Sequence, residues 1–260
     1  MSVLLETKQL NKTYVIGKEN EQKVLKDVDL KIMSGEFVSV MGPSGSGKST
    51  LLYNICGMDK MSKGSVRFNE RELSTLTEKE LSALRLNEMG FIFQQIHLLK
   101  NLSILDNIIL SGYLAHNQRR GMVEKRAVEL MEKTGISELA KNNISQASGG
   151  QLQRVGICRA LINEPDIIFG DEPTGALNSK SSDEIMELLA GFNRGGTTVM
   201  LVTHDVKVAA KTERVLFMMD GRIVAEKHMG KYSGNGSGEN GEDIKAREER
   251  LSAWLLELGF

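Results

Sequence analysis

The chain has 260 residues, which is enough for a well-buried core in one large domain or in a domain with a smaller lobe. Its 33 basic and 34 acidic residues give a formal net charge of -1, which argues against the basic surface of a nucleic-acid-binding protein. The two cysteines, Cys56 and Cys158, are too few for a disulfide framework, so we expect buried core thiols in a reducing compartment.

The start of the chain, MSVLLETKQL, lacks the basic residues and the apolar run of a signal peptide. No stretch approaches the roughly 18 consecutive apolar residues that a membrane helix needs. We therefore expect a cytoplasmic location, with any membrane role exercised through a partner.

Taken in chain order, the apolar residues predict strands separated by helices. DVDLKIMSG, EFVSVMG and GSVRFNE have strand patterns, and residues 77–160 look mainly helical. DIIFGDEP and TTVMLVTHD are continuous apolar runs, which are typical of buried parallel strands. In RVLFMMDGRIVAE, the pair Asp220-Gly221 predicts a hairpin with a type I′ turn. This order predicts an α/β sheet with a helical insertion.

The composition changes towards the end of the chain. Residues 231–243 are rich in glycine and polar residues, which indicates a flexible linker. Residues 244–260 resume helical spacing and place one apolar face at Leu251, Trp254, Leu255 and Leu258. This helix either packs back on the body of the protein or docks on a partner.

The stretch GPSGSGKST fits the phosphate-binding pattern G-x-x-x-x-G-K-[ST] between a strand and a helix. Its glycines allow a tight turn whose N–H groups, together with the helix N-terminus, favour an anion. Lys48 adds a full positive charge, and Ser49 adds a hydroxyl for Mg²⁺. A simple glycine-serine turn would need neither group, but the motif alone does not separate kinases, GTPases and ATPases. The candidate nucleotide ligands here are Gly42, Pro43, Ser44, Gly45, Ser46, Gly47, Lys48, Ser49 and Thr50.

Polar residues follow three further apolar runs. Asp171 and Glu172 end a predicted buried strand, where a carboxylate can hold Mg²⁺ and its neighbour can activate water, which favours hydrolysis over transfer. An acidic turn stopped by Pro173 is the alternative. His204 and Gln94 hold similar positions, within reach of a phosphate, a metal or a water, although each could also be structural.

A second glycine-rich helix start lies at Ser148, Gly149, Gly150 and Gln151. It exposes N–H groups and a hydroxyl, so it can form a second anion site. Serine is also a preferred helix cap, and an isolated S-G-G would be interpreted as a cap. The order of the motifs along the chain favours the anion site.

This order of motifs resembles the nucleotide-binding subunit of ABC transporters over roughly residues 3–228. The resemblance implies a P-loop NTPase core with a mostly parallel sheet, an N-terminal antiparallel β subdomain and a helical subdomain at about residues 95–160. It implies an ATP-binding domain over residues 1–230, followed by the linker and the C-terminal helix.

The resemblance also assigns roles to the motif residues. The loop from Gly42 to Thr50 looks like Walker A, and Ser148 to Gln151 look like the ABC signature. It implies Mg²⁺ ligands at Ser49, Gln94 and Asp171, with ATP as the nucleotide. Lys48, the catalytic glutamate Glu172 and the switch histidine His204 would carry the reaction, and Tyr14 would stack on adenine.

In this family two copies face each other head to tail, so that Walker A of one and the signature of the other clamp one ATP. The stretches GFIFQQIHLLKNLSILDNIIL and DEPTGALNSK look most like bacterial lipoprotein-release, macrolide-export and antimicrobial-peptide-resistance transporters. The resemblance therefore implies a second copy, an integral membrane permease and a peripheral position on the inner face of the membrane. Leu98, Leu99, Leu102 and Ile104 either meet the permease or pack in the core.

Two positions depart from the family pattern. Ala147 stands where leucine usually begins the signature, which removes apolar volume, and Asn178 replaces the aspartate of the family's ALD motif, which removes a charge. The smaller Ala147 is expected to loosen the packing at the helix start, and the charge lost at Asn178 puts in doubt how tightly closure couples to hydrolysis. An ATP-dependent clamp outside transport and a regulatory ATP binder are the alternatives to a transport ATPase.

Overall fold

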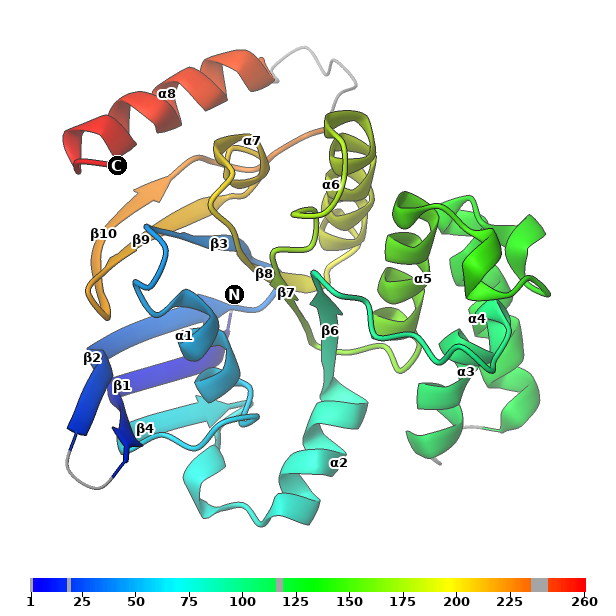
Figure 1. The fold of residues 1–260 in the computed structure, drawn as a ribbon, viewed down its shortest axis with the longest axis horizontal. Helices are drawn as coiled ribbons and strands as arrows, with labels where there is room; N and C mark the ends of the chain where they lie inside the picture. The colour runs from blue at the N-terminus through cyan, green and yellow to red at the C-terminus, as the bar shows by residue number, and fades with distance from the viewer. Residues whose placement is uncertain (1, 18–19, 116–118, 235–242) are drawn as a thin grey trace.

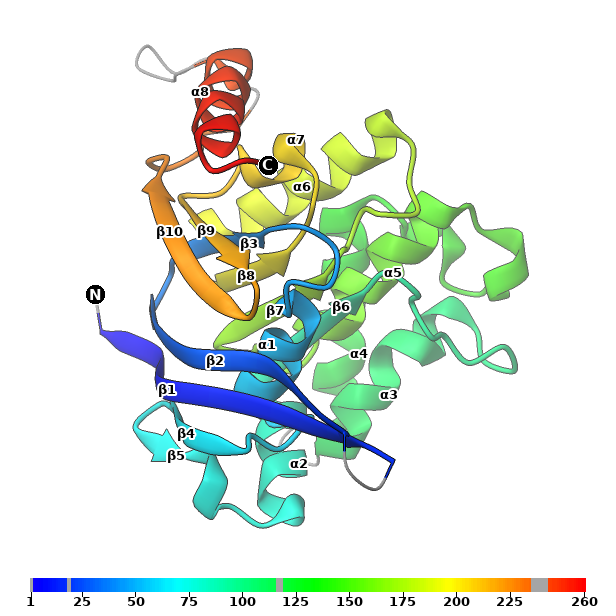
Figure 2. The same cartoon turned by 60° about the vertical axis from the view of Figure 1, so that its left-hand side comes forward.

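The computed structural model describes residues 2–17, 20–115, 119–234 and 243–260 (Figures 1 and 2). The linker predicted at 231–243 lies largely outside these ranges. Within them the strands form two sheets, and none of the helices combines the length and apolar character needed to span a bilayer.

The larger sheet has six strands in the order β10-β9-β3-β8-β7-β6. Every neighbouring pair is parallel except β9 with β10. Asp220 and Gly221 join those two strands with φ of 48° and 81°, which confirms the predicted type I′ turn. The strands are β3 (Phe37–Met41), β6 (Met89–Phe93), β7 (Ile167–Asp171), β8 (Thr198–Val202), β9 (Arg214–Met219) and β10 (Arg222–His228).

The smaller sheet is antiparallel and has the order β2-β1-β4-β5. Its apolar residues share one buried cluster with the helix α1 (Lys48–Ile55) and with one face of the larger sheet. Figure 2 shows α1 held between the two sheets. The strands are β1 (Val3–Ile16), β2 (Asn20–Met33), β4 (Lys63–Phe68) and β5 (Arg71–Glu72).

The region predicted as mainly helical also contains a strand. β6 follows helix α2 directly and pairs with β7, while the other regular elements of residues 77–160 are helices, as predicted. A five-residue apolar run fits a strand or a helix, and only the neighbouring strand decides between them. The helices here are α2 (Glu78–Glu88), α3 (Ile104–Ala115), α4 (Arg120–Thr134) and α5 (Gly149–Leu161), with short 3₁₀ turns at Leu73–Thr75, Ser137–Leu139 and Ile144–Gln146.

Helices α3, α4 and α5 form a separate group beside β6 (Figure 1). Cys158 lies in α5 and Cys56 lies at the end of α1; both are buried and free. Burial raises the pKa of each thiol to about 12, as expected for core thiols without reactivity.

Helix α6 (Ser179–Arg194) precedes β8. The C-terminal helix α8 (Ile244–Glu257) packs back on the body, over β9, β10 and the short α7 (Val206–Ala209) (Figure 1). Leu251 and Leu255 are buried there, with Trp254 and Leu258 partly buried beside them. The buried guanidinium of Arg247 donates to backbone carbonyls of Ala210, Thr212, Met229 and Gly230. The structure thus favours the first interpretation of this helix.

Candidate functional site

A cavity of about 650 Å³ opens where β3, β7 and β8 end, the edge at which open α/β sheets bind ligands. Residues far apart in the sequence line it, and most of them belong to the motifs described above. The lining residues are Gln22, Val24, Gly42, Pro43, Ser44, Gly45, Gly47, Lys48, Ser49, Thr50, Glu172, His204 and Phe260.

The glycine-rich loop before α1 has a backbone that side chains would obstruct. At Gly42 φ is 151°, and a Cβ there would lie 2.0 Å from the carbonyl oxygen of Met218. Gly47, with φ of 101°, begins α1 without any side-chain cap. The first N–H groups of α1 therefore lack a side-chain acceptor at the cap and can bind an anion. The Ser46 hydroxyl beside them is buried, with no hydrogen-bond partner in the described residues.

Lys48 folds back on its own loop. Its Nζ donates to the carbonyl oxygens of Gly42 at 2.8 Å and Pro43 at 2.9 Å. Burial lowers the pKa of Lys48, while the charges of Glu172 and Asp171 act in the opposite direction. The loop thus keeps a half-buried cation beside the cavity.

Ser49 and Asp171 meet as predicted from the two motifs. The Ser49 hydroxyl donates to Asp171 Oδ1 at 3.0 Å, and the Tyr53 hydroxyl donates to Oδ2 at 2.8 Å. Burial and Asp171 raise the pKa of Tyr53 to about 12, so its hydroxyl stays a donor. The sequence analysis missed Tyr53, although its place one turn after Ser49 is a usable signal.

Glu172 and His204 form a pair at the cavity. His204 Nδ1 lies 2.8 Å from Glu172 Oε1, and the Glu172 side chain is 26% exposed. Glu172 has φ of 47°, a left-handed backbone conformation that is uncommon for glutamate and that concentrates at functional sites. Its N–H donates to Val202 O at 2.9 Å, which fixes this conformation against β8.

Gln94 follows β6 and comes close to the same carboxylate. A Cβ on Gly175 would lie 3.0 Å from Gln94 Nε2 and 3.1 Å from Glu172 Oε2, so both side chains flank this glycine. The amide of Gln94 therefore lies beside the carboxyl end of β7, although it does not line the cavity itself.

The second glycine-rich turn lies apart from this cavity. Ser148 caps α5 in a reciprocal box with Gln151: the Gln151 N–H donates to Ser148 Oγ at 3.3 Å, and the Ser148 N–H donates to Gln151 Oε1 at 2.8 Å. In one chain these residues act as a helix cap. Ala147 before them packs partly buried against the core of the helical group.

Tyr14 lies beside the cavity rather than in its lining. Its hydroxyl donates to Asp59 Oδ2 at 2.6 Å. Asn178 caps α6, where its Oδ1 accepts from the Ser181 N–H at 2.9 Å.

Three lining residues carry no signal in the sequence. Gln22 and Val24 come from β2, and Phe260 follows α8, with its ring 5.6 Å from that of Phe217. Among the described residues no three His, Cys, Asp or Glu side chains gather as a metal cluster. A metal at this edge would therefore need hydroxyl or amide oxygens in addition to carboxylates.

The family model described as "ABC transporter" matches residues 25–175, more than half of the chain. The chain belongs to the ABC transporter family. A macrolide export ATP-binding/permease protein of Hahella chejuensis is 44% identical over 97% of this chain, which spans 39% of that relative's length. A bacitracin export ATP-binding protein of Halalkalibacterium halodurans is 42% identical over 88% of this chain and 90% of its own.

A solved ATP-binding cassette, dimeric and in a post-hydrolysis state with ADP and Pi, has 40% sequence identity and a TM-score of 0.81, covering 88% of this chain and all of that one. These findings confirm the P-loop NTPase fold that the motifs predicted. The chain is an ABC-type ATPase that binds ATP.

Proposed function

We propose that this ABC ATPase powers the export or membrane extraction of an amphiphilic molecule through a separate permease. The names of the relatives, which refer to macrolide, bacitracin and syringafactin export, support this class of substrate. The single observation that carries the catalytic part is the meeting of Lys48, Ser49, Asp171, Glu172 and His204 at one edge of the sheet.

In this proposal Lys48 leaves its loop carbonyls to bind the phosphates of ATP. The N–H groups at the start of α1 also bind the phosphates and stabilise their negative charge. Glu172 accepts a proton from the attacking water, and His204 orients Glu172 and approaches the terminal phosphate. The 2.8 Å contact between these two side chains supports this pairing.

The oxygen atoms at this edge fit Mg²⁺, which prefers hard oxygen ligands. Ser49 and Asp171 already lie 3.0 Å apart, and Gln94 lies beside Glu172. We propose these three residues as its ligands; bound there, the ion would offset negative charge on the phosphates.

A second copy of the chain would complete the site. Ser148 to Gln151 do not line the cavity of their own chain, so a head-to-tail partner is needed to bring them to it. Ser148 and the N-terminus of α5 would then face the terminal phosphate from the opposite side.

A groove of about 480 Å³ between α2, β6 and the helical group is the proposed seat of the permease. Leu99, which is 51% exposed, lines it together with Phe91, Phe93 and Arg159. Ile104 is buried in the core instead, and Leu98 is partly buried against it. Through this groove the subunit would attach to the inner face of the membrane.

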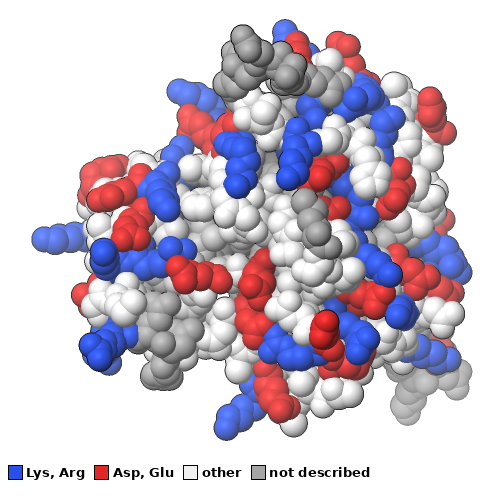
Figure 3. Space-filling view, turned by 180° about the vertical axis from the view of Figure 1, so that it is seen from behind, with Lys and Arg blue, Asp and Glu red and all other residues white. Residues whose placement is uncertain are grey.

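The alternative of a clamp on nucleic acid has no such support. Basic and acidic side chains are interspersed on the face shown in Figure 3.

The test is ATP turnover with Mg²⁺, wild type beside Glu172→Gln, with the mass of each protein measured in ATP. We expect the wild type to turn over ATP. The variant should keep ATP binding, lose nearly all turnover and accumulate as a dimer, because only the proton acceptor is removed.

Unchanged turnover in Glu172→Gln would exclude the proposed role of this carboxylate. Binding without turnover in both proteins would call for the permease to be added. If turnover then still fails, the chain is a regulatory binder.

A further inference from the structure

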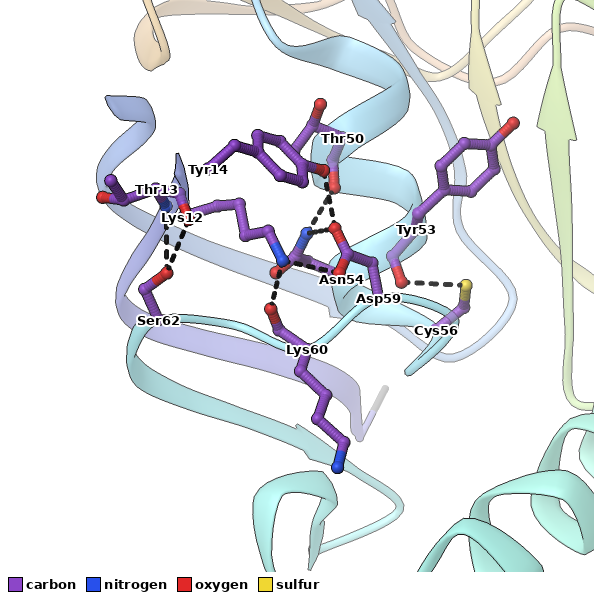
Figure 4. Close-up of polar contacts among 10 residues, drawn as sticks. All are labelled: Lys12, Thr13, Tyr14, Thr50, Tyr53, Asn54, Cys56, Asp59, Lys60 and Ser62. Atoms are coloured by element: carbon purple, nitrogen blue, oxygen red, sulfur yellow. Dashed lines mark hydrogen bonds and ion pairs between the residues drawn. The ribbon is translucent and has the colours of Figure 1, made fainter. Parts of the chain in front are cut away.

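Four consecutive residues of β1 contact the short segment 59–62, which connects α1 to β4. Figure 4 shows three of them, Lys12, Thr13 and Tyr14. Asn11 O accepts from the Ser62 N–H at 2.8 Å, and the Thr13 N–H donates to Ser62 Oγ at 2.9 Å. Lys12 and Tyr14 contact the same segment through their side chains. β1 is thus fixed to the segment that follows the phosphate-loop helix.

Asp59 is the centre of this contact. Its Oδ1 accepts from Lys12 Nζ at 2.5 Å, and its Oδ2 accepts from the Tyr14 hydroxyl at 2.6 Å. Burial acts to raise the pKa of Asp59, but the hydrogen bonds from Lys12 and Tyr14 outweigh it and the pKa is lowered. The carboxylate is therefore charged when it holds the phenol.

Lys12 and Tyr14 also contact each other directly. Lys12 Nζ lies 4.6 Å from the centroid of the Tyr14 ring, and the Lys12 side chain is only 10% exposed. A nearly buried ammonium therefore covers one part of the ring, while Tyr14 as a whole stays 38% exposed. The exposed surface of the ring is free to stack on a planar ligand.

Asn54 of α1 connects this network to the phosphate loop (Figure 4). Its Nδ2 donates to Asp59 Oδ2 at 3.5 Å and to Thr50 O at 2.9 Å, and Thr50 lines the 650 Å³ cavity. The ring is thus held at a fixed place relative to the loop that would bind the phosphates. A ring fixed before binding loses less rotamer entropy when a ligand stacks on it.

We propose that Asp59 and Lys12 are positioning residues that hold Tyr14 as the platform for the nucleotide base. This inference rests on the proposed ATPase function and on the adenine-stacking role that the family resemblance implies for Tyr14. It predicts that the network affects affinity for the base and leaves the binding of the phosphates unchanged.

The experiment measures Kd for ATP without Mg²⁺ and Kd for inorganic tripolyphosphate, which has no base, by calorimetry. The variants are Tyr14→Phe, which removes only the hydroxyl, Asp59→Asn, and their combination. Each single variant should raise Kd for ATP roughly 3- to 10-fold, because a rotamer must now be fixed on binding. Kd for tripolyphosphate should not change, KM should rise without a fall in kcat, and the combination should add little.

Tyr113→Phe is the matched control. The Tyr113 hydroxyl donates to Glu124 at 2.6 Å beside Arg120, so it is another tyrosine, carboxylate and cation group, placed in the helical group. It should leave both Kd values unchanged.

Equal losses of ATP and tripolyphosphate affinity in Asp59→Asn would overturn the inference, since they would show a general structural role. Tyr14→Ala distinguishes a failure of the positioning role of Asp59 from a failure of the stacking role of Tyr14. If Tyr14→Ala weakens ATP binding while Tyr14→Phe and Asp59→Asn do not, only the positioning role is wrong. If Tyr14→Ala has no effect either, Tyr14 is not the platform.

Discussion

Two helices of the chain, α1 and α5, begin at glycine-rich turns. The turns differ in whether a side chain caps the first N–H groups of the helix. Before α1, glycine is required by the backbone: Gly42 has no room for a Cβ, and Gly47 leaves the helix without a side-chain cap. Before α5, Ser148 and Gln151 cap the helix. A Cβ on Gly149 would meet only ordinary contact, at 3.7 Å from Leu177.

Turns of similar composition can therefore leave a helix N-terminus either uncapped, as before α1, or capped, as before α5. The first turn is shaped to receive an anion within one chain, because its N–H groups lack an internal cap. At the second turn, Ser148 and Gln151 already cap the helix in the free chain. The proposed phosphate, which a second copy of the chain would bring, must therefore compete with this cap.

The largest expected contrast is Gly42→Ala against Gly149→Ala. The first forces a methyl group against the Met218 carbonyl, 2.0 Å away, and overpacking of this kind costs about 1–3 kcal/mol of unfolding free energy. It should also lose nucleotide binding. Gly149→Ala should leave stability and protomer binding intact. Urea unfolding and ATP titration check both, and equal losses would remove the distinction between the turns.

Lys48→Met should separate binding from stability at the first turn. A cation in the first turn of a helix opposes the helix dipole, and burial already lowers the pKa of Lys48, so its removal should not reduce stability. Stabilisation by ATP, about 2.7 kcal/mol at a hundred times Kd, should vanish. Thermal unfolding with and without ATP measures this. A variant that ATP still stabilises fully would contradict it.

Ser148→Ala tests the second turn and should cost about 1 kcal/mol, the usual value for a lost helix cap. ATP affinity of the isolated protomer should stay the same, while turnover should fall. Ser148→Asp restores a cap but places a negative charge towards the proposed phosphate. It should recover stability without turnover, and recovery of both would limit Ser148 to capping.

The smallest effect is expected from Asn178→Asp. Asn178 caps α6 through Ser181, and a Cβ on Gly150 of the second turn would lie 3.2 Å from Ser181 Oγ. Aspartate caps equally well and adds about 0.3–1 kcal/mol through the helix dipole. Turnover should rise modestly if the lost charge loosens coupling. A fall in turnover would show that this chain hydrolyses ATP faster with asparagine than with aspartate at position 178.

The sequence predicted these two turns, the carboxylate pair and the apolar face of α8, because each depends on local spacing. The sequence analysis did not predict β6, because pairing with β7, and not the local pattern, makes Met89–Phe93 a strand. Phe260 was missed for the same reason, because its partner Phe217 lies far away in the chain. Tyr53 was missed although its place one turn after Ser49 is a usable signal.

What the sequence determined by itself is the chemistry: a glycine-rich loop that carries a lysine and a serine, and carboxylates at the end of a buried strand. Tertiary structure decided which groups meet. It placed Ser49 on Asp171, Glu172 on His204, and Tyr14 on Asp59. Such contacts depend on how strands and helices pack across 32 to 122 residues of chain, and no local pattern encodes that packing.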